Sequence, residues 1–178
     1  MVSQLKEKIN ISVDTINKLS EVDLADLCNI TEQAISAGGG FGWLRVPTRT
    51  VLNQYWNKIT EDNLTNLIVG RLNGVIAGTL QLTYEEKNVE SRKNIAQIKR
   101  QFVAPWARGY GLAKSMIDFS EEKAKEDNIK SIQLAIRETQ EAAVKLFLSK
   151  DYQEWGKNPY YAFINGSFIK GIYFYKNL

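Results

Sequence analysis

Two Asn-Gly dipeptides, each between two apolar runs, constrain the fold of this chain more than any other feature. Asn73-Gly74 separates LIVGRL from VIAGTLQLTY, and Asn165-Gly166 lies between the aromatic runs of YYAFINGSFIKGIYFY. An Asn-Gly pair fits the two-residue turn whose twist matches that of antiparallel strands. The sequence therefore predicts two antiparallel hairpins, one in the middle of the chain and one at its end.

The segments around these hairpins show helix and strand patterns in turn. Ile9, Ile11 and Val13 alternate as in a strand, and the run 95–103 is expected to add a third strand to the central hairpin. Helices are expected to begin at Ser20 and at Pro47, and to cover 112–124 and 141–150, with a strand over 131–137. This order predicts a mixed α/β (α+β) fold, in which helices flank a central, mostly antiparallel sheet.

Composition limits the number of domains and the classes of partner. The chain has 178 residues, 44% of them hydrophobic, and no linker interrupts it, so we expect 1–178 to form a single domain. The net charge of +3 is too small and too dispersed to indicate a nucleic-acid surface. The densest basic cluster is interpreted as a solvated strand edge and loop rather than a phosphate-binding face: Arg92, Lys93, Lys99 and Arg100.

Histidine is absent, and this excludes several kinds of site together. A count of 0 His rules out Ser-His and Cys-His nucleophile pairs, histidine bases and histidine metal ligands, so no metal site is expected. The single cysteine, Cys28, cannot form a disulfide within the chain. No stretch approaches the ~18 apolar residues of a membrane span, and we expect a soluble cytoplasmic protein without membrane partners.

The segment PWARGYGLAKSM places Gly109 and Gly111 just before a predicted helix. It fits neither common nucleotide motif, because Lys114 replaces the third glycine of G-x-G-x-x-G, and Arg108 and Ala113 replace both glycines of the Walker pattern. Two interpretations remain. The segment is either a plain turn into a helix or a loop whose backbone amides hold a pyrophosphate.

These residues resemble the GNAT superfamily of N-acetyltransferases. The family's signature R-x-x-G-x-[GA], which follows a strand ending in V-x-P, is matched by Arg108, Gly111 and Ala113 behind Val103 and Pro105. The predicted element order is also that of the GNAT fold. GGGFGWLRVPTRTVLNQYW and NPYYAFINGSFIKGIYFYKNL resemble segments of one bacterial subgroup of unknown acceptor specificity. The resemblance runs from about residue 8 to the end.

The resemblance implies transfer of an acetyl group from acetyl-CoA to a primary amine, by direct attack within a ternary complex. The amine belongs to a small molecule or a peptide, and a homodimer is left open. Main-chain groups of Gln101, Phe102 and Val103 would pair with the pantetheine arm, one amide also polarising the thioester carbonyl. The pyrophosphate would be held by amides of the glycine loop: Arg108, Gly109, Tyr110, Gly111, Leu112 and Ala113.

The sequence departs from the family pattern at one position, where the family usually has the tyrosine that reprotonates the leaving thiolate. The motif N-x-x-A-x-x-L-Y is matched by Gln140, Ala143, Leu146 and Phe147, and phenylalanine has no proton to give. Gln140 would replace the asparagine that bonds the pantetheine, and Tyr152 or solvent would supply the proton. A thiol of pKa ~8.5 leaves as thiolate at a cost of about 2 kcal/mol at pH 7, so turnover is still expected.

The acceptor amine must also lose a proton. An amine of pKa ~10.4 is deprotonated about once in 10³ at neutral pH, at a cost of roughly 4–5 kcal/mol. Glu85 and Glu86 are the candidate proton acceptors, with Tyr84 and Glu138 as alternatives. The acceptor pocket is expected among five aromatic residues, unless these belong to the core: Phe41, Trp43, Trp56, Tyr160 and Tyr161.

Two alternatives to an active enzyme remain. The second hypothesis is a catalytically weak or silent CoA-binding regulatory module of the same fold, and it is motivated by Phe147 at the position of the usual tyrosine. A nucleotide-binding α/β domain is the third hypothesis, and it predicts a preference for ATP or NAD over CoA.

Overall fold

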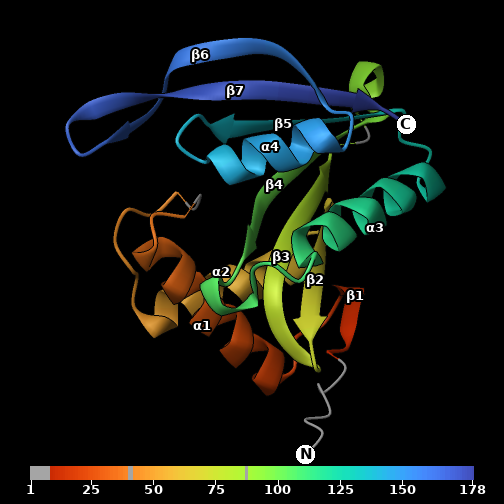
Figure 1. Ribbon diagram of the computed structural model, residues 1–178. Coiled ribbons are helices and arrows are strands. Elements are labelled where there is room, and N and C mark those ends of the chain that lie inside the picture. The colour runs from red at the N-terminus through yellow and green to blue at the C-terminus, as the bar shows by residue number, and fades with distance from the viewer. Residues whose placement is uncertain (1–8, 40–41, 87) are drawn as a thin grey trace, which may run out of the picture.

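The computed structural model describes residues 9–39, 42–86 and 88–178, and shows a seven-stranded sheet with helices packed on it (Figure 1). In chain order the elements are β1 (Ile11–Ile16), α1 (Glu21–Ser36), α2 (Arg49–Glu61), β2 (Thr65–Leu72), β3 (Val75–Tyr84), η1 (Glu90–Arg92), β4 (Ile95–Val103), η2 (Pro105–Ala107), α3 (Leu112–Glu126), β5 (Ser131–Arg137), α4 (Glu141–Ser149), β6 (Gln153–Ile164) and β7 (Ser167–Asn177). The predicted mixed α/β order is confirmed. None of the helices in the described residues is long and apolar enough to cross a membrane.

The two predicted hairpins are confirmed, as β2–β3 and β6–β7. Asn73 and Gly74 have φ angles of 50° and 85°, and Asn165 and Gly166 have 50° and 80°. These left-handed angles are the ones that a two-residue turn between antiparallel strands requires. The strand order in the sheet is β1-β2-β3-β4-β5-β7-β6, and of the neighbouring pairs only β4 and β5 are parallel.

The parallel pair separates toward the carboxyl ends of its strands. β4 and β5 are in register only from Ile95 opposite Ser131 to Gln97 opposite Gln133. Beyond Gln97, β4 pairs with β3 alone among the described strands, whereas β5 pairs with β7 along its length. Two strand edges therefore face each other across a gap, and such edges offer main-chain donors and acceptors to an extended ligand.

Helices cover both faces of the sheet at β2 and β3. Leu67, Ile68 and Val69 are consecutive and all buried, so neither face of β2 is solvated. The helices α1 and α2 pack on one face and α3 on the other (Figure 1). Ser20 begins α1 as predicted, because its hydroxyl accepts a hydrogen bond from the amide of Asp23.

Candidate cofactor and acceptor site

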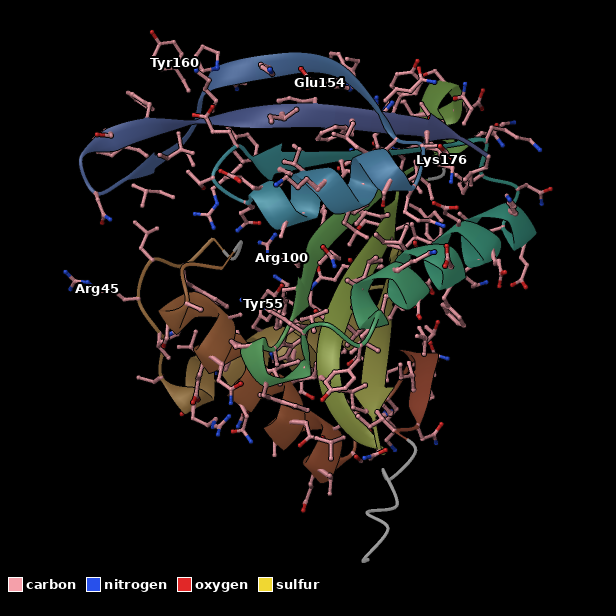
Figure 2. All side chains as sticks on the ribbon, viewed as in Figure 1. Arg45, Tyr55, Arg100, Glu154, Tyr160 and Lys176 are labelled. Atoms are coloured by element: carbon pink, nitrogen blue, oxygen red, sulfur yellow. The ribbon has the colours of Figure 1, made fainter. Side chains whose placement is uncertain are left out.

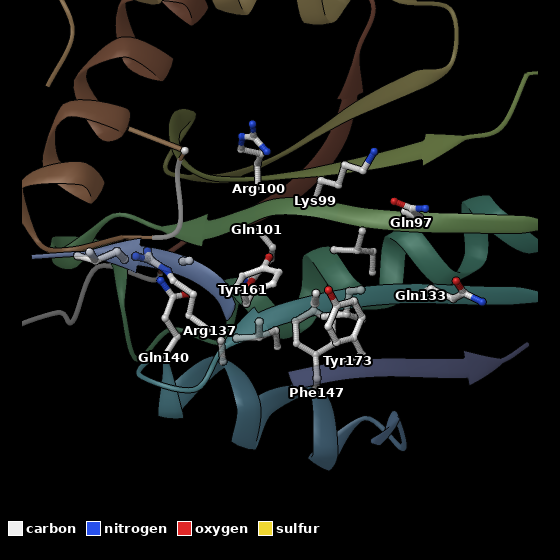
Figure 3. Close-up of a pocket in the computed structure, with 18 of the residues that line it drawn as sticks. Gln97, Lys99, Arg100, Gln101, Gln133, Arg137, Gln140, Phe147, Tyr161 and Tyr173 are labelled. Carbon is white, nitrogen blue, oxygen red and sulfur yellow. The ribbon is translucent and has the colours of Figure 1, made fainter. Parts of the chain in front are cut away.

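A cavity of about 840 Å³ lies where β4 and β5 separate (Figure 3). Its walls come from η1, β4, β5, α4, the β6–β7 hairpin and the connection between α1 and α2. Three of the expected cofactor-binding residues are among the lining residues: Gln101, Gln140 and Phe147. Phe102 and Val103 continue the same strand without lining the cavity. Ligand sites in proteins are typically of this size, ~300–1,000 Å³.

A β-bulge interrupts β4 inside this cavity. The register with β3 shifts between Thr79 and Gln81, and Arg100 has a positive φ of 52°. The Thr79 hydroxyl donates to the Arg100 carbonyl oxygen at 3.2 Å. Regular alternation would place Lys99 and Arg100 on opposite faces, but Figure 3 shows both side chains on the same side of β4. The bulge thereby brings two consecutive cations into the cavity wall.

The loop between β4 and α3 presents a run of open backbone amides. Gly111 is the N-cap residue of α3 with φ 81°, and Gly109 has φ 85°. The amide of Ser115 donates to the Gly111 carbonyl at 3.0 Å, but for the amides of 109–114 we find no acceptor in the part of the chain that the structure describes. A Cβ atom at either glycine would meet nothing within 4 Å. These residues fit a pyrophosphate, because consecutive amides at a helix start attract anions.

The glycine loop and the cavity are distinct features. None of the residues 108–113 lines the cavity, although the loop follows β4 directly. The Arg108 amide donates to the Pro105 carbonyl at 3.4 Å, so the expectation that this amide faces a phosphate is not supported. The Arg108 side chain is exposed and remains available to bind a phosphate. A ligand that used both features would be long, with its anionic part at the loop and its other end in the cavity.

None of the predicted proton acceptors lines the cavity. Glu85 is linked to the lining, since its carboxylate accepts a hydrogen bond at 2.9 Å from Nε of Arg92, a lining residue. Glu86 is exposed. The Tyr84 hydroxyl donates to Asp127 at 2.7 Å, and burial together with that carboxylate raises the pKa of Tyr84. Tyr84 is thus held against the end of α3 and does not fit the role of a base.

Tyr152 does not fit the role of proton donor to the thiolate. It is 2% exposed and does not line the cavity, and its ring packs edge-on against Phe147 with 5.0 Å between centroids. Burial, followed by the charge of Glu121, raises the pKa of Tyr152. Of these two packed rings, only that of Phe147 belongs to a lining residue. Glu138, the remaining alternative base, forms an exposed ion pair with Lys170 at 3.8 Å and also lies outside the lining.

The predicted aromatic pocket is only partly assembled. Tyr161 lines the cavity, and Trp43 lines an adjoining hollow of about 470 Å³. Trp56 is wrong as a pocket residue, because it is fully buried in the core with 0% exposure. Tyr160 is 69% exposed and lies outside the lining. Phe41 lies outside the described residues.

The structure corrects the interpretation of the basic cluster and adds a residue that sequence reasoning missed. Arg92, Lys99 and Arg100 line the cavity, whereas Lys93 does not; Lys93 and Lys99 are nevertheless exposed, so the interpretation as a solvated edge holds in part. Arg137, at the end of β5, also lines it, and its guanidinium donates to the Gly39 carbonyl at 2.6 Å. Across the described residues, no cluster of three or more His, Cys, Asp or Glu side chains could hold a metal ion.

A sheet that separates between two parallel strands, with open amides at the start of the next helix, is the arrangement expected from the resemblance to CoA-dependent acetyltransferases. Comparison with known proteins identifies the family. Residues 28–151 match the acetyltransferase (GNAT) family, and the chain belongs to it. An uncharacterised N-acetyltransferase in the hisH-hisA intergenic region of Azospirillum brasilense is 40% identical over 131 residues, 74% of this chain and 78% of that protein.

Solved structures share the fold at low sequence identity. An N-acetyltransferase from Staphylococcus aureus Mu50 has a TM-score of 0.80 at 16% identity, covering 94% of this chain and 98% of the other. A phosphinothricin acetyltransferase from Sinorhizobium meliloti, in complex with acetyl-CoA, has a TM-score of 0.78 at 14% identity, covering 94% and 88%. The chain is an acetyl-CoA-dependent acetyltransferase, and acetyl-CoA is its cosubstrate.

Proposed function

We propose that the chain, as a single domain over 1–178, transfers the acetyl group directly to a primary amine while both substrates are bound. The observation that carries this proposal is the run of open amides at 109–114, next to the gap between β4 and β5. These amides hold the pyrophosphate of acetyl-CoA, and the edge of β4 from Gln101 to Val103 that faces β5 pairs with the pantetheine arm. The thioester then lies in the cavity with the amine.

The residues around the thioester bind the cosubstrate, stabilise the charge that develops on the carbonyl oxygen and line the path of the leaving sulfur. A main-chain amide beside the bulge in β4 donates to the carbonyl oxygen and stabilises the negative charge that develops there when nitrogen attacks carbon. Gln140 bonds the amides of the pantetheine arm. Phe147 supplies an apolar wall and no proton, so the sulfur leaves as thiolate, at about 2 kcal/mol at pH 7, and takes its proton from solvent.

The proton of the amine leaves through solvent to Glu85. Glu85 is the predicted carboxylate that bonds a lining residue, Arg92, and it therefore stands at the border of the cavity. The proposed acceptor is a small molecule or a peptide that carries a primary amine. The sequence adds the proposal of a cytoplasmic protein without nucleic-acid or membrane partners.

A thermal-shift titration with acetyl-CoA, ATP and NAD tests the cofactor site. Gly111→Glu puts charge and a strained φ into the glycine loop, and Gly74→Glu is the matched control, since both glycines have φ above 80° and open space around them. Acetyl-CoA at ~100 times its dissociation constant should add about 2.7 kcal/mol, a shift of several degrees. We expect this shift in the wild type and in Gly74→Glu, and its loss in Gly111→Glu. A response to ATP or NAD alone contradicts the proposal.

Thiol release with a panel of amines then separates an enzyme from a silent module. Phe147, at the place of the usual tyrosine, is the observation that favours the silent module as a second candidate. Acetyl-CoA binding with acceptor-dependent thiol release supports transfer. Binding without release above background, across the whole panel, supports the module.

A further inference from the structure

The cavity wall is cationic. Arg92, Lys99, Arg100 and Arg137 all line it, and no Asp or Glu does so among the described residues. Arg92 is paired with Glu85 outside the lining, so part of its charge is compensated there, whereas Lys99 and Arg100 form no ion pair with a described residue. Such a wall favours an anion in the cavity and disfavours an ammonium.

Arg100 is the cation placed most directly to bind a ligand. Its Nε is buried and has no hydrogen-bond partner among the described residues. The side chain lies in the body of the protein near Tyr55, whereas Arg45 points outward (Figure 2). Burial raises the pKa of Tyr55, and the charge of Arg100 opposes that rise, which reflects how near the two groups are. A buried donor without an acceptor is costly, and a ligand anion would supply the acceptor.

The phosphates of the cosubstrate do not account for these cations. The open amides at 109–114 offer a separate place for the pyrophosphate, and none of the residues 108–113 lines the cavity. The thioester end, which the proposed function puts in the cavity, is uncharged. The remaining ligand there is the acceptor.

We infer that the acceptor is a small primary amine that also carries an anionic group, a carboxylate or a phosphonate, and that Arg100 binds this group. The inference rests on the proposed function. Lys99 and Arg137 add to the attraction for the anion, while Tyr161 and Tyr173 line the wall for an organic side chain. The same cations lower the pKa of the bound amine, since like charge disfavours the ammonium, and so increase the neutral fraction that attacks.

Matched acceptor pairs test the inference on the wild-type protein. Each pair differs in its anion, and rates are compared at equal concentration of the neutral amine because the pKa of the amine differs within a pair: free amino acids against their amides, and aminomethylphosphonate against methylamine. We expect kcat/KM to be at least about tenfold higher for the anionic member, with glycine compared against aminomethylphosphonate to distinguish carboxylate from phosphonate. Equal rates for acids and amides overturn the inference and leave the proposed function standing. No acceptor-dependent turnover at all overturns the proposed function, and the inference falls with it.

Variants assign the preference to Arg100. Arg100→Gln keeps a polar side chain without charge and should raise the KM of anionic acceptors about tenfold, bringing the acid-to-amide ratio near one. The thermal shift with acetyl-CoA should be unchanged. Arg45→Gln is the control, because Arg45 is exposed and does not line the cavity. If Arg100→Gln weakens acetyl-CoA binding and leaves the ratio intact, Arg100 binds a cosubstrate phosphate and the inference is wrong.

Discussion

Gly70 and Gly78 face each other across β2 and β3, and the first turns of α3 lie directly on both. A Cβ on Gly70 would come within 2.7 Å of Leu112 Cδ1, and a Cβ on Gly78 within 2.9 Å of Met116 Cε. Leu112 is the first residue of α3. The two glycines therefore let the helix approach the sheet closely and fix the start of α3, where the glycine loop ends.

Gly78→Ala should destabilise the fold. Its Cβ would also lie 2.8 Å from the Phe102 carbonyl oxygen, a backbone atom of β4 that cannot rotate away. Overpacking of this kind costs about 1–3 kcal/mol, which urea unfolding would measure. Gly156→Ala, also in a strand but with nothing within 4 Å, should change the free energy of unfolding by less than about 0.5 kcal/mol. Equal losses in both variants would contradict the close approach of α3.

Tyr152→Phe tests the sequence-based hypothesis that Tyr152 donates the proton to the leaving thiolate. The hydroxyl is buried and has no hydrogen-bond partner in the described residues, and Tyr152 does not line the cavity. Turnover should therefore stay within about twofold of wild type, and the free energy of unfolding should be unchanged or rise, since an unsatisfied buried hydroxyl is removed. A large fall in kcat with normal acetyl-CoA binding would restore Tyr152 as the proton donor.

The strand and helix order follows from the sequence because its signals are local. Each Asn-Gly pair contains the residues that its own turn requires, and Ser20 caps the helix that begins beside it. The loop of Gly109 and Gly111 directly before α3 was likewise predictable, since both glycines lie within one signature of six residues. None of these predictions depends on which distant segment packs nearby.

The cavity wall could not be predicted, because it depends on contacts between distant segments. Strand alternation assigns Lys99 and Arg100 to opposite faces, and no residue in β4 signals the bulge that puts them together. Trp56 and Tyr152 are residue types that often line pockets, but both are buried, Trp56 with its indole N–H donating to Thr31 of α1 and Tyr152 with its ring against Phe147. Whether an aromatic residue faces a cavity or the core is decided by that packing.

Asp23 should make the stability of the protein depend on acid pH. Burial by itself would raise the pKa of Asp23, but hydrogen bonds from Arg71 and Ser20 outweigh it and lower the pKa below its usual value. The stabilisation is therefore complete above the unfolded pKa of ~3.9 and is lost as pH falls through the folded value. Asp23→Asn should cost about 1–3 kcal/mol at pH 7 and much less at pH 3.

Urea unfolding at both pH values checks this difference. Glu122→Gln, an exposed position on α3, is the control and should be near neutral at either pH. A loss for Asp23→Asn that is the same at pH 7 and pH 3 would assign it to packing and not to ionisation.

Glu85→Gln and Glu86→Gln form a matched pair for the proton acceptor. Glu85 bonds the lining residue Arg92, whereas the neighbouring Glu86 is exposed. Glu85→Gln should lower kcat about 10²-fold at pH 7, the lower end of the ~10²–10⁴-fold range for general acid–base catalysis. The deficit should shrink as pH rises and the free amine becomes abundant. A flat deficit across pH, or an equal one in Glu86→Gln, would exclude Glu85 as the base.

Arg137 should control acceptor binding by holding the connection between α1 and α2. Its guanidinium joins the end of β5 to the carbonyls of Gly38 and Gly39, at 3.3 and 2.6 Å, and Gly42 and Leu44 of the same connection line the cavity. Arg137→Gln should raise the acceptor KM about tenfold with no change in acetyl-CoA binding. Arg137→Lys keeps the charge but loses the fork that reaches two carbonyls. If the two hydrogen bonds to Gly38 and Gly39 are required, Arg137→Lys has the same raised KM as Arg137→Gln but still prefers anionic acceptors. Wild-type kinetics in Arg137→Lys would instead mean that the charge alone is required.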